Sequence, residues 1–316
     1  LTKHSISGKS LPYKTSAEIL KGLRFPNAYT LSKRITELLI NKYRGSIPVA
    51  IVRPSIIGAS EREPIRGWID PQYVNAQSFG SASLYLLVGL GLLRVIPGNN
   101  EAISDQIPVD YVINAIILAS TKVNRKKKLN IFHIGSSASN NPCSWADAIR
   151  GVLAYWKTHP LRNNMQPDKP EFQMVSNKLW YYASLFMRKK WMGKSYEYIS
   201  RKISKPLDKV TGGSIDPTSV GALMHEMQTQ ALHLSKHLKY NESGHPSLSF
   251  VNDASFHYFT LNQWIFETRQ IMSIFEELCI SSKDREYFNV DVDQIDWDSY
   301  FQHFCYGLHR FCLRED

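Results

Sequence analysis

Residues 26–55 read PNAYTLSKRITELLINKYRGSIPVAIVRPS, which is a helical pattern followed at once by an apolar strand. Apolar residues recur at helical intervals as far as the glycine at position 45: Leu31, Ile35, Leu38 and Leu39. The strand runs from Val49 to Val52 without a polar interruption. A helix that leads into an unbroken apolar strand is typical of a parallel sheet covered by helices on both faces. The stretch therefore predicts an α/β fold.

Tyr29 and Lys33 form a candidate catalytic pair on this predicted helix. They lie four residues apart, so their side chains share one face. A phenol has a pKa of about 10 in water, and an ammonium beside it favours the phenolate. A tyrosine in this setting can donate a proton to a carbonyl oxygen that is being reduced. Because Tyr198 and Lys202 repeat the spacing without such surroundings, the order of helix and strand carries the prediction.

The 316-residue chain is 43% apolar, which suffices for one large domain or two ordinary ones. Its formal charge of +10 suits phosphorylated cofactors, coenzyme A, nucleic acid or an anionic membrane without selecting among them. The histidines form no ligand motif, and no paired spacing relates the four cysteines: Cys143, Cys279, Cys305 and Cys312. We therefore expect neither a metal site nor a disulfide framework.

Two apolar segments bear on membrane association, although no run of about 18 apolar residues suggests a spanning helix. The segment 84–93 is apolar for only ten residues and predicts a buried helix. The segment 179–191 combines aromatic and aliphatic residues with a basic cluster. It favours an amphipathic core helix, with a helix in contact with a membrane surface as the alternative.

Three regions follow one another along the chain. Residues 1–150 alternate helices and strands, with strands expected at Val49–Val52, around Ala102–Val109 and at Leu129–Ile134. Residues 151–255 form a connecting region with several loop signals, and they include the segment that could contact a membrane. Residues 256–316 predict a helical C-terminal domain, because apolar residues recur at helical intervals from Tyr258 to Phe275.

A glycine-rich turn for a dinucleotide is missing from the sequence. No Gly-x-Gly-x-x-Gly occurs, although a pyrophosphate normally needs that close backbone approach at a helix N-terminus. Gly89 and Gly91 lack a preceding strand, so they predict close packing. The chain also begins at Leu1 without an initiator methionine, which suggests a fragment or a processed product.

Several separated motifs resemble the alcohol-forming fatty acyl-CoA reductases, a branch of the extended short-chain dehydrogenase/reductase superfamily. The matching stretches are residues 26–33 with Glu37 following, 52–57, 63–70, 102–114 and 287–301. The last of these separates the group from sugar epimerases, which share the tyrosine and lysine. The resemblance implies the C-terminal part of a doubly wound NAD(P)-binding Rossmann-type domain, followed by a mostly helical fatty acyl-CoA reductase domain.

The same resemblance implies a reaction and a set of roles. The family uses NADPH twice to take a long-chain acyl-CoA to a primary alcohol, so the expected partner is an acyl-CoA and not a nucleic acid. Tyr29 would be the general acid, and Lys33 would lower its pKa and hydrogen-bond the nicotinamide ribose. Pro54, Ser55 and Ile56 would contact the nicotinamide ring. The family often works at peroxisomal or endoplasmic reticulum membranes inside the cell, which is the expected location here.

Departures from the family pattern keep other functions open. Without the glycine-rich turn we expect this chain to bind NADPH poorly or not at all, and none of the serines upstream of Tyr29 ends an apolar strand. The alternatives are a non-catalytic, reductase-like protein that binds lipid or a partner, and an extended-family sugar epimerase or aldehyde reductase. Asp110 predicts a helix cap or a surface turn. Asp296 and Trp297 predict an N-cap followed by a core tryptophan.

Overall fold

The computed structural model describes residues 13–70, 80–89, 91, 93–123, 129–160, 171–177 and 254–313. The predicted helix at 179–191 and the second tyrosine–lysine pair, at 198 and 202, lie outside these residues. Within the described ranges, no helix combines the length and the apolar character that a membrane span requires.

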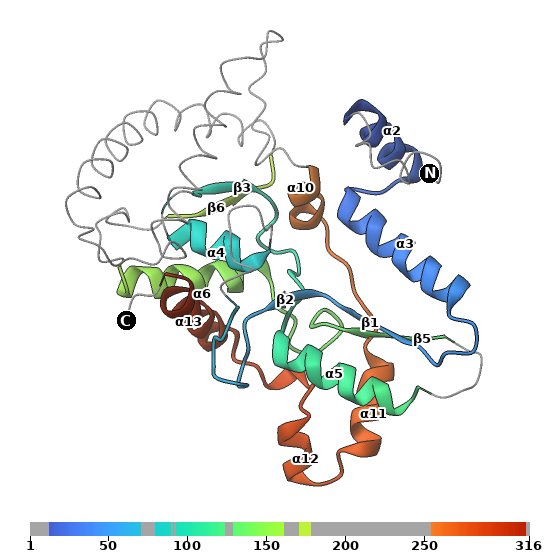
Figure 1. Ribbon diagram of the computed structural model, residues 1–316. Helices are drawn as coiled ribbons and strands as arrows, with labels where there is room; N and C mark the ends of the chain where they lie inside the picture. Colours follow the sequence, from blue (N-terminus) through green and yellow to red (C-terminus); the bar gives the residue numbers. More distant parts are fainter. Residues whose placement is uncertain are drawn as a thin grey trace, which may run out of the picture.

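In the described residues the fold is built on three pairs of strands, and all three of these pairs are parallel. β1 (Ala50–Pro54) pairs with β5 (Asn130–Ile134), β2 (Ile56–Gly58) with β4 (Gln106–Pro108), and β3 (Val95–Pro97) with β6 (Gln173–Val175). The helices that accompany them are α2 (Tyr13–Leu23), α3 (Ala28–Tyr43), α4 (Ser81–Gly89), α5 (Val109–Thr121) and α6 (Trp145–Thr158). Parallel strands joined through helices confirm the predicted α/β class (Figure 1).

The predicted elements lie close to where the sequence placed them. β1, β4 and β5 match the three expected strands, although β4 is shorter than the predicted strand around 102–109. The apolar segment from position 84 belongs to α4, in which most residues are buried, so the prediction of a buried helix is confirmed. Gly89 packs as predicted, because a Cβ at this position would lie 2.2 Å from the Trp156 ring.

The C-terminal part of the chain contains four α-helices: α10 (Ala254–Leu261), α11 (Arg269–Leu278), α12 (Ser282–Tyr287) and α13 (Trp297–Gly307). A short 3-10 turn (Val292–Gln294) precedes α13, and a π-helical turn (Leu308–Cys312) follows it. The helical periodicity predicted from Tyr258 to Phe275 is wrong in its middle, because residues 262–268 are not helical.

Tertiary hydrogen bonds explain this interruption. The Ile103 amide donates to Gln263 Oε1 at 3.1 Å, and the Phe266 amide donates to Ser137 Oγ at 2.9 Å. The segment 262–268, which we call the crossing segment, thus runs past residues that precede β4 and follow β5 (Figure 1). These long-range partners outweigh the local helical pattern.

The C-terminal helices share one hydrophobic core with the α/β part. A single cluster of buried side chains includes residues of α4, α5, α6, α11 and α13. α13 packs along α6, where a Cβ on Gly151 would lie 2.7 Å from the Phe301 Cβ. Phe301 itself is completely buried and meets Tyr85 edge to face at 5.7 Å between ring centroids. The two parts are therefore packed together as one body.

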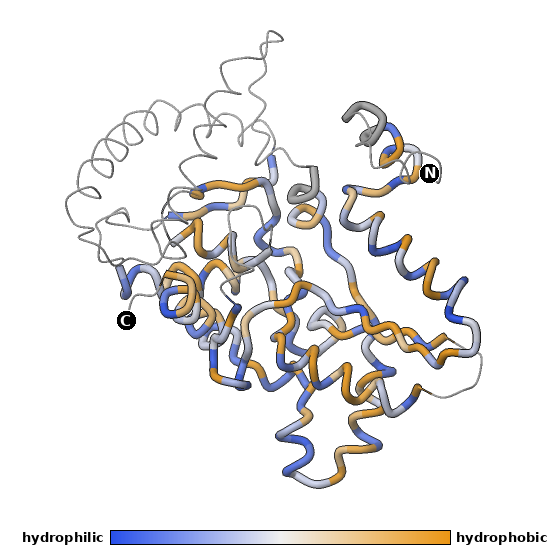
Figure 2. Tube along the Cα trace, viewed as in Figure 1, coloured by the Kyte–Doolittle hydropathy of each residue, from blue (hydrophilic) through white to orange (hydrophobic). Residues whose placement is uncertain are grey.

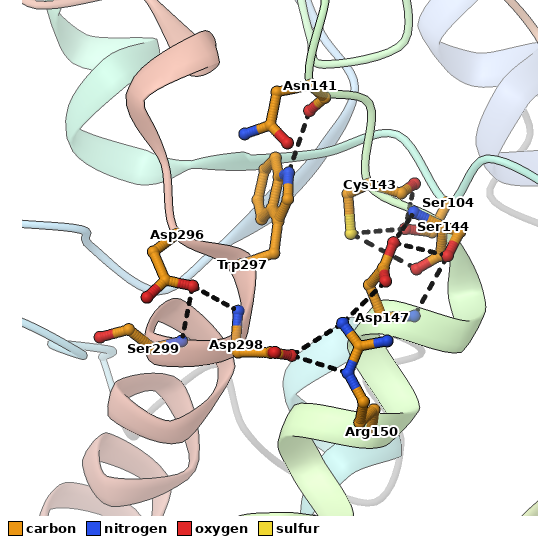
Figure 3. Close-up of polar contacts among 10 residues, drawn as sticks. All are labelled: Ser104, Asn141, Cys143, Ser144, Asp147, Arg150, Asp296, Trp297, Asp298 and Ser299. Atoms are coloured by element: carbon orange, nitrogen blue, oxygen red, sulfur yellow. Dashed lines mark hydrogen bonds and ion pairs between the residues drawn. The ribbon is translucent and has the colours of Figure 1, made fainter.

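Polar contacts tie the beginnings of α6 and α13 together (Figure 3). Asp296 caps α13 by accepting from the amides of Asp298 and Ser299, which confirms the predicted N-cap. Arg150 bridges the two helices, with its Nη2 2.9 Å from Asp147 Oδ1 and 2.9 Å from Asp298 Oδ1.

Two buried groups complete this region (Figure 3). Trp297 is buried as predicted, and its Nε1 donates to the Asn141 carbonyl at 3.0 Å. Burial raises the pKa of the nearby Cys143 thiol to about 12, so it remains protonated at neutral pH.

Candidate functional site

Pro54, Ser55 and Ile56 lie at the carboxyl end of β1 and β5, where β2 begins. Pro54 ends β1 opposite Ile134, and Ile56 begins β2, so Ser55 alone separates the two strands. The Ser55 amide donates to the Ile134 carbonyl at 2.9 Å. Ligands of open α/β sheets bind outside the carboxyl ends of the strands. The structure thus brings the three predicted cofactor-binding residues to the expected edge, while their role remains a prediction.

Asp105 organises this edge, and sequence reasoning gave it no role. Its Oδ1 accepts hydrogen bonds from the amides of Ser136, at 2.7 Å, and Ser137, at 3.2 Å. Its carbonyl accepts from the Ile56 amide at 3.0 Å, and its backbone has a positive φ of 43°. A non-glycine residue in this region is strained and is held there by its surroundings. The signal in the sequence is a polar triplet, Ser104 to Gln106, directly before an apolar strand.

Two buried polar atoms at this edge lack a partner among the described residues. They are the Ser55 hydroxyl and the second carboxylate oxygen of Asp105. Both crowd Gly135, where a Cβ would lie 3.0 Å from Ser55 Oγ and 3.1 Å from Asp105 Oδ2. Unused hydrogen-bonding groups are uncommon in folded interiors, and they concentrate at functional sites. The carboxyl edge therefore holds hydrogen-bonding capacity that the fold itself does not use.

Tyr29 and Lys33 lie on the first turns of α3. Asn27 caps this helix, accepting from the Thr30 amide at 2.8 Å. Lys33 Nζ is 5.3 Å from the centroid of the Tyr29 ring, which confirms that the two side chains share a face. Tyr29 is 66% exposed, so its hydroxyl can be reached by a substrate. The catalytic roles of both residues remain predictions.

An ion pair connects α3 to the strand that carries Pro54 and Ser55. Glu37 of α3 accepts two hydrogen bonds from Arg53 of β1, 2.7 Å to Nε and 2.6 Å to Nη2. In the described part of the chain, neither Tyr29 nor Lys33 forms a hydrogen bond with the residues at the strand end. The predicted catalytic pair and the predicted cofactor contacts are thus linked through Glu37 and Arg53.

The prediction that Asp110 caps a helix or lies in a surface turn is wrong. Pro108 occupies the N-cap position of α5, and Asp110 is buried. The carboxylate accepts hydrogen bonds from three successive backbone amides in the loop after β2, those of Glu61, Arg62 and Glu63, at 3.0, 2.8 and 3.2 Å. Asp110 therefore fixes the start of the loop that follows the predicted cofactor contacts.

Replacing Asp110 by asparagine is expected to lower the free energy of unfolding by about 1–3 kcal/mol, because one carboxylate oxygen becomes an amide nitrogen that faces backbone N–H donors. Urea denaturation measures the change. Glu286→Gln serves as the control, since Glu286 is exposed and the change should stay within about 0.5 kcal/mol. Equal stability of the two variants would show that the loop amides do not depend on the Asp110 charge.

The described residues suit the nicotinamide end of a dinucleotide. The carboxyl end of β1 and the exposed tyrosine–lysine pair are where such a ring and ribose would bind. The sequence holds no Gly-x-Gly-x-x-Gly turn for the pyrophosphate. Among the described residues, no cluster of histidine, cysteine or acidic side chains could hold a metal ion.

Comparison with known families agrees with this geometry. Residues 8–116 match the NAD-binding model described as male sterility protein, and residues 251–315 match the Sterile model with the same description. The first match contains Tyr29, Lys33 and the strand end, and it indicates a nicotinamide cofactor. The second contains the crossing segment and α13.

Curated relatives match along most of the chain. Fatty acyl-CoA reductase 1 of Homo sapiens and of Gallus gallus are each 28% identical over 293 residues, which cover 92% of this chain and 48% of the relative. Fatty acyl-CoA reductase 2 of Mus musculus shows the same identity and coverage. The chain thus spans about half the length of the curated relatives it matches. The chain thus carries matches to both male sterility domains in order, and it is similar to the fatty acyl-CoA reductases over 92% of its length.

Proposed function

We propose that this chain carries the nicotinamide and carbonyl side of an NADPH-dependent reductase that converts a long-chain acyl-CoA to a primary fatty alcohol. The observation that carries the proposal is the placement of an exposed tyrosine–lysine pair on a helix tied by an ion pair to the strand end at Ser55. The names of the relatives support an acyl-CoA as substrate. The choice of NADPH over NADH rests on the resemblance described above.

The residues of the chain act on the carbonyl oxygen. NADPH, when bound, supplies the hydride. Negative charge then develops on the oxygen, and the exposed Tyr29 hydroxyl can reach that oxygen and donate its proton. Lys33 lies beside the Tyr29 ring on the same face of α3, with its Nζ 5.3 Å from the ring centroid. Pro54, Ser55 and Ile56 would contact the ring that carries the hydride.

The chemistry of the substrate extends the proposal to its surroundings. A long-chain acyl-CoA joins an apolar chain to an anionic head group, and a basic protein of charge +10 suits the latter. We propose that the protein meets this substrate at a membrane surface, and the resemblance favours the peroxisome or the endoplasmic reticulum. Cell fractionation tests the proposed membrane association separately from the proposed reaction.

The test of the proposed reaction uses the complete polypeptide that contains this sequence. Oxidation of NADPH is followed with palmitoyl-CoA, and the lipid product is identified by mass spectrometry. We expect a fatty alcohol to form, with NADH a poorer reductant. Turnover of a nucleotide sugar in place of palmitoyl-CoA would contradict the proposal and favour an epimerase.

A second candidate is a non-catalytic, reductase-like protein that binds lipid or a partner. The observation in its favour is the absence of a Gly-x-Gly-x-x-Gly turn from the 316 residues. Titration of the complete polypeptide with NADPH, followed by the fluorescence of the reduced nicotinamide, separates the two candidates. Binding without turnover of any acyl-CoA would favour the non-catalytic function.

A further inference from the structure

The helix that carries Tyr29 and Lys33 buries little of its surface. None of the residues of α3 is classed as buried, and two of its leucines, Leu38 and Leu39, are 51% and 48% exposed. Figure 2 shows hydrophilic and apolar residues alternating along this helix. Apolar burial is the usual force that docks a helix on a sheet, and here it is weak. The position of α3 must therefore depend strongly on specific polar contacts.

The ion pair between Glu37 and Arg53 is the contact that can supply this specificity. Two parallel N–H donors of the guanidinium bind both carboxylate oxygens, which fixes direction as well as distance. The side chains are only 20% and 36% exposed, so the pair is partly shielded from water. The Arg53 hydrogen bonds hold the pKa of Glu37 below its usual value, and the pair stays charged at neutral pH. Arg34 also lies 3.4 Å from Glu37, but it belongs to the same helix, so this contact does not attach α3 to a strand.

Arg53 is itself anchored in the middle of the fold. It lies on β1 opposite His133 of β5, and its Nη1 is 3.4 Å from His133 Nε2. The His133 ring lies 5.7 Å from the Phe266 ring of the crossing segment. Arg53 also directly precedes Pro54, the first of the predicted cofactor contacts. One guanidinium is therefore in contact with α3, β5 and, through His133, the crossing segment.

The spacing along α3 relates this anchor to the predicted catalytic pair. Tyr29, Lys33 and Glu37 follow one another at intervals of four residues, which places them along one broad stripe of the helix. Tyr29 is two turns from Glu37, about 12 Å along the helix axis. Because of this distance, a small rotation of α3 about the ion pair would displace the phenol of Tyr29 more than it displaces Glu37.

We infer that Glu37 and Arg53 are positioning residues that dock α3 on β1 and thereby set the place of Tyr29 and Lys33 relative to Pro54 and Ser55. The docking follows from the geometry of the pair alone. Its consequence for catalysis rests on the proposed reductase function. Neither residue touches the substrate or the cofactor in this assignment.

Hydrogen exchange of the 316-residue chain tests the docking without any cofactor. Glu37→Gln and Arg53→Met are expected to raise the exchange rates of amides in Ala28–Tyr43 about fivefold or more, because local opening becomes easier. Glu277→Gln is the matched control, since the ion pair of Lys122 and Glu277, at 2.6 Å, also joins two elements, the end of α5 and α11, but lies far from α3 in sequence and in contacts. This control variant should leave the amide exchange rates of α3 unchanged.

A double variant with the two charges exchanged distinguishes the loss of this ion pair from a general loss of folding. The double variant Glu37→Arg with Arg53→Glu restores an opposite pair at the same place, so exchange in α3 should return most of the way to the wild-type rate. Unchanged α3 exchange in both single variants would overturn the inference. Exchange in α3 that is as fast in the double variant as in the single variants would also overturn the inference. Exchanging the two charges restores an ion pair but does not restore side-chain packing.

Kinetics of the complete polypeptide test the consequence for catalysis. Glu37→Gln should lower kcat about tenfold or more, while the KM for palmitoyl-CoA changes less than about threefold, since displacement of a reacting group costs rate rather than binding. Faster α3 exchange with an unchanged kcat would overturn the positioning role. A wild-type protein without reductase activity would refute the proposed function, and the exchange experiment would still decide whether the pair docks α3.

Discussion

Replacement of Tyr29 by phenylalanine is expected, under the proposed reductase function, to lower the rate of acyl-CoA reduction by about 10²–10⁴, the usual contribution of a general acid. The ring remains, but no proton reaches the oxygen on which negative charge develops. Tyr29 is 66% exposed, so the variant should keep the wild-type stability within about 0.5 kcal/mol. Initial rates of NADPH oxidation with palmitoyl-CoA, measured on the complete polypeptide, give the effect on kcat.

The same helix offers a matched control for this prediction. Tyr43 is 69% exposed near the end of α3, and Lys42 Nζ lies 5.2 Å from its ring centroid. Tyr43→Phe thus removes a hydroxyl with the same chemistry and a similar cation, but at the end of the helix away from the carboxyl edge. It should leave kcat unchanged. Equal rates for Tyr29→Phe and Tyr43→Phe would show that another group protonates the carbonyl.

Replacement of Phe301 by alanine is expected to lower the free energy of unfolding by about 3–5 kcal/mol, the range for a large buried aromatic side chain. Phe301 is completely buried between Tyr85, Trp297 and the helix α6, where Gly151 allows a close approach. The neighbouring Gln302 is exposed, and Gln302→Ala should change stability by no more than about 0.5 kcal/mol. Urea denaturation followed by tryptophan fluorescence measures both.

The shape of that unfolding curve is informative as well. Since α13 contributes to the same core as α4, α5 and α6, the described parts should unfold in one cooperative transition. Loss of Phe301 should move the whole transition to lower urea without splitting it. Two separate transitions in the wild-type protein would show that the C-terminal helices fold independently.

Local patterns in the sequence were sufficient to predict most of the α/β elements. The helix around Tyr29, the strand up to Arg53 and the buried helix from Leu84 are each encoded by periodicity and composition within a short window. The spacing of Tyr29 and Lys33 likewise predicted a shared face, because helix geometry alone decides it.

Features that depend on distant partners could not be predicted in the same way. The crossing segment has a helical pattern, but hydrogen bonds to Ile103 and Ser137 keep it extended. Asp110 looked like a surface residue because nothing nearby shows that it will meet three loop amides almost fifty positions earlier. The pairing of Glu37 with Arg53 also joins separate elements, although both residues belong to recognised motifs.

The close approach of Gly151 to Phe301 has a consequence for recombination between relatives. A chimera that takes its C-terminal helices from one parent and its α/β part from another separates position 151 of α6 from the helix α13 that packs against it. A Cβ at position 151 would lie 2.7 Å from the Cβ of residue 301, so glycine at 151 sets how closely α13 can approach α6. Crossover points in this family should therefore be chosen so that the two positions are inherited together.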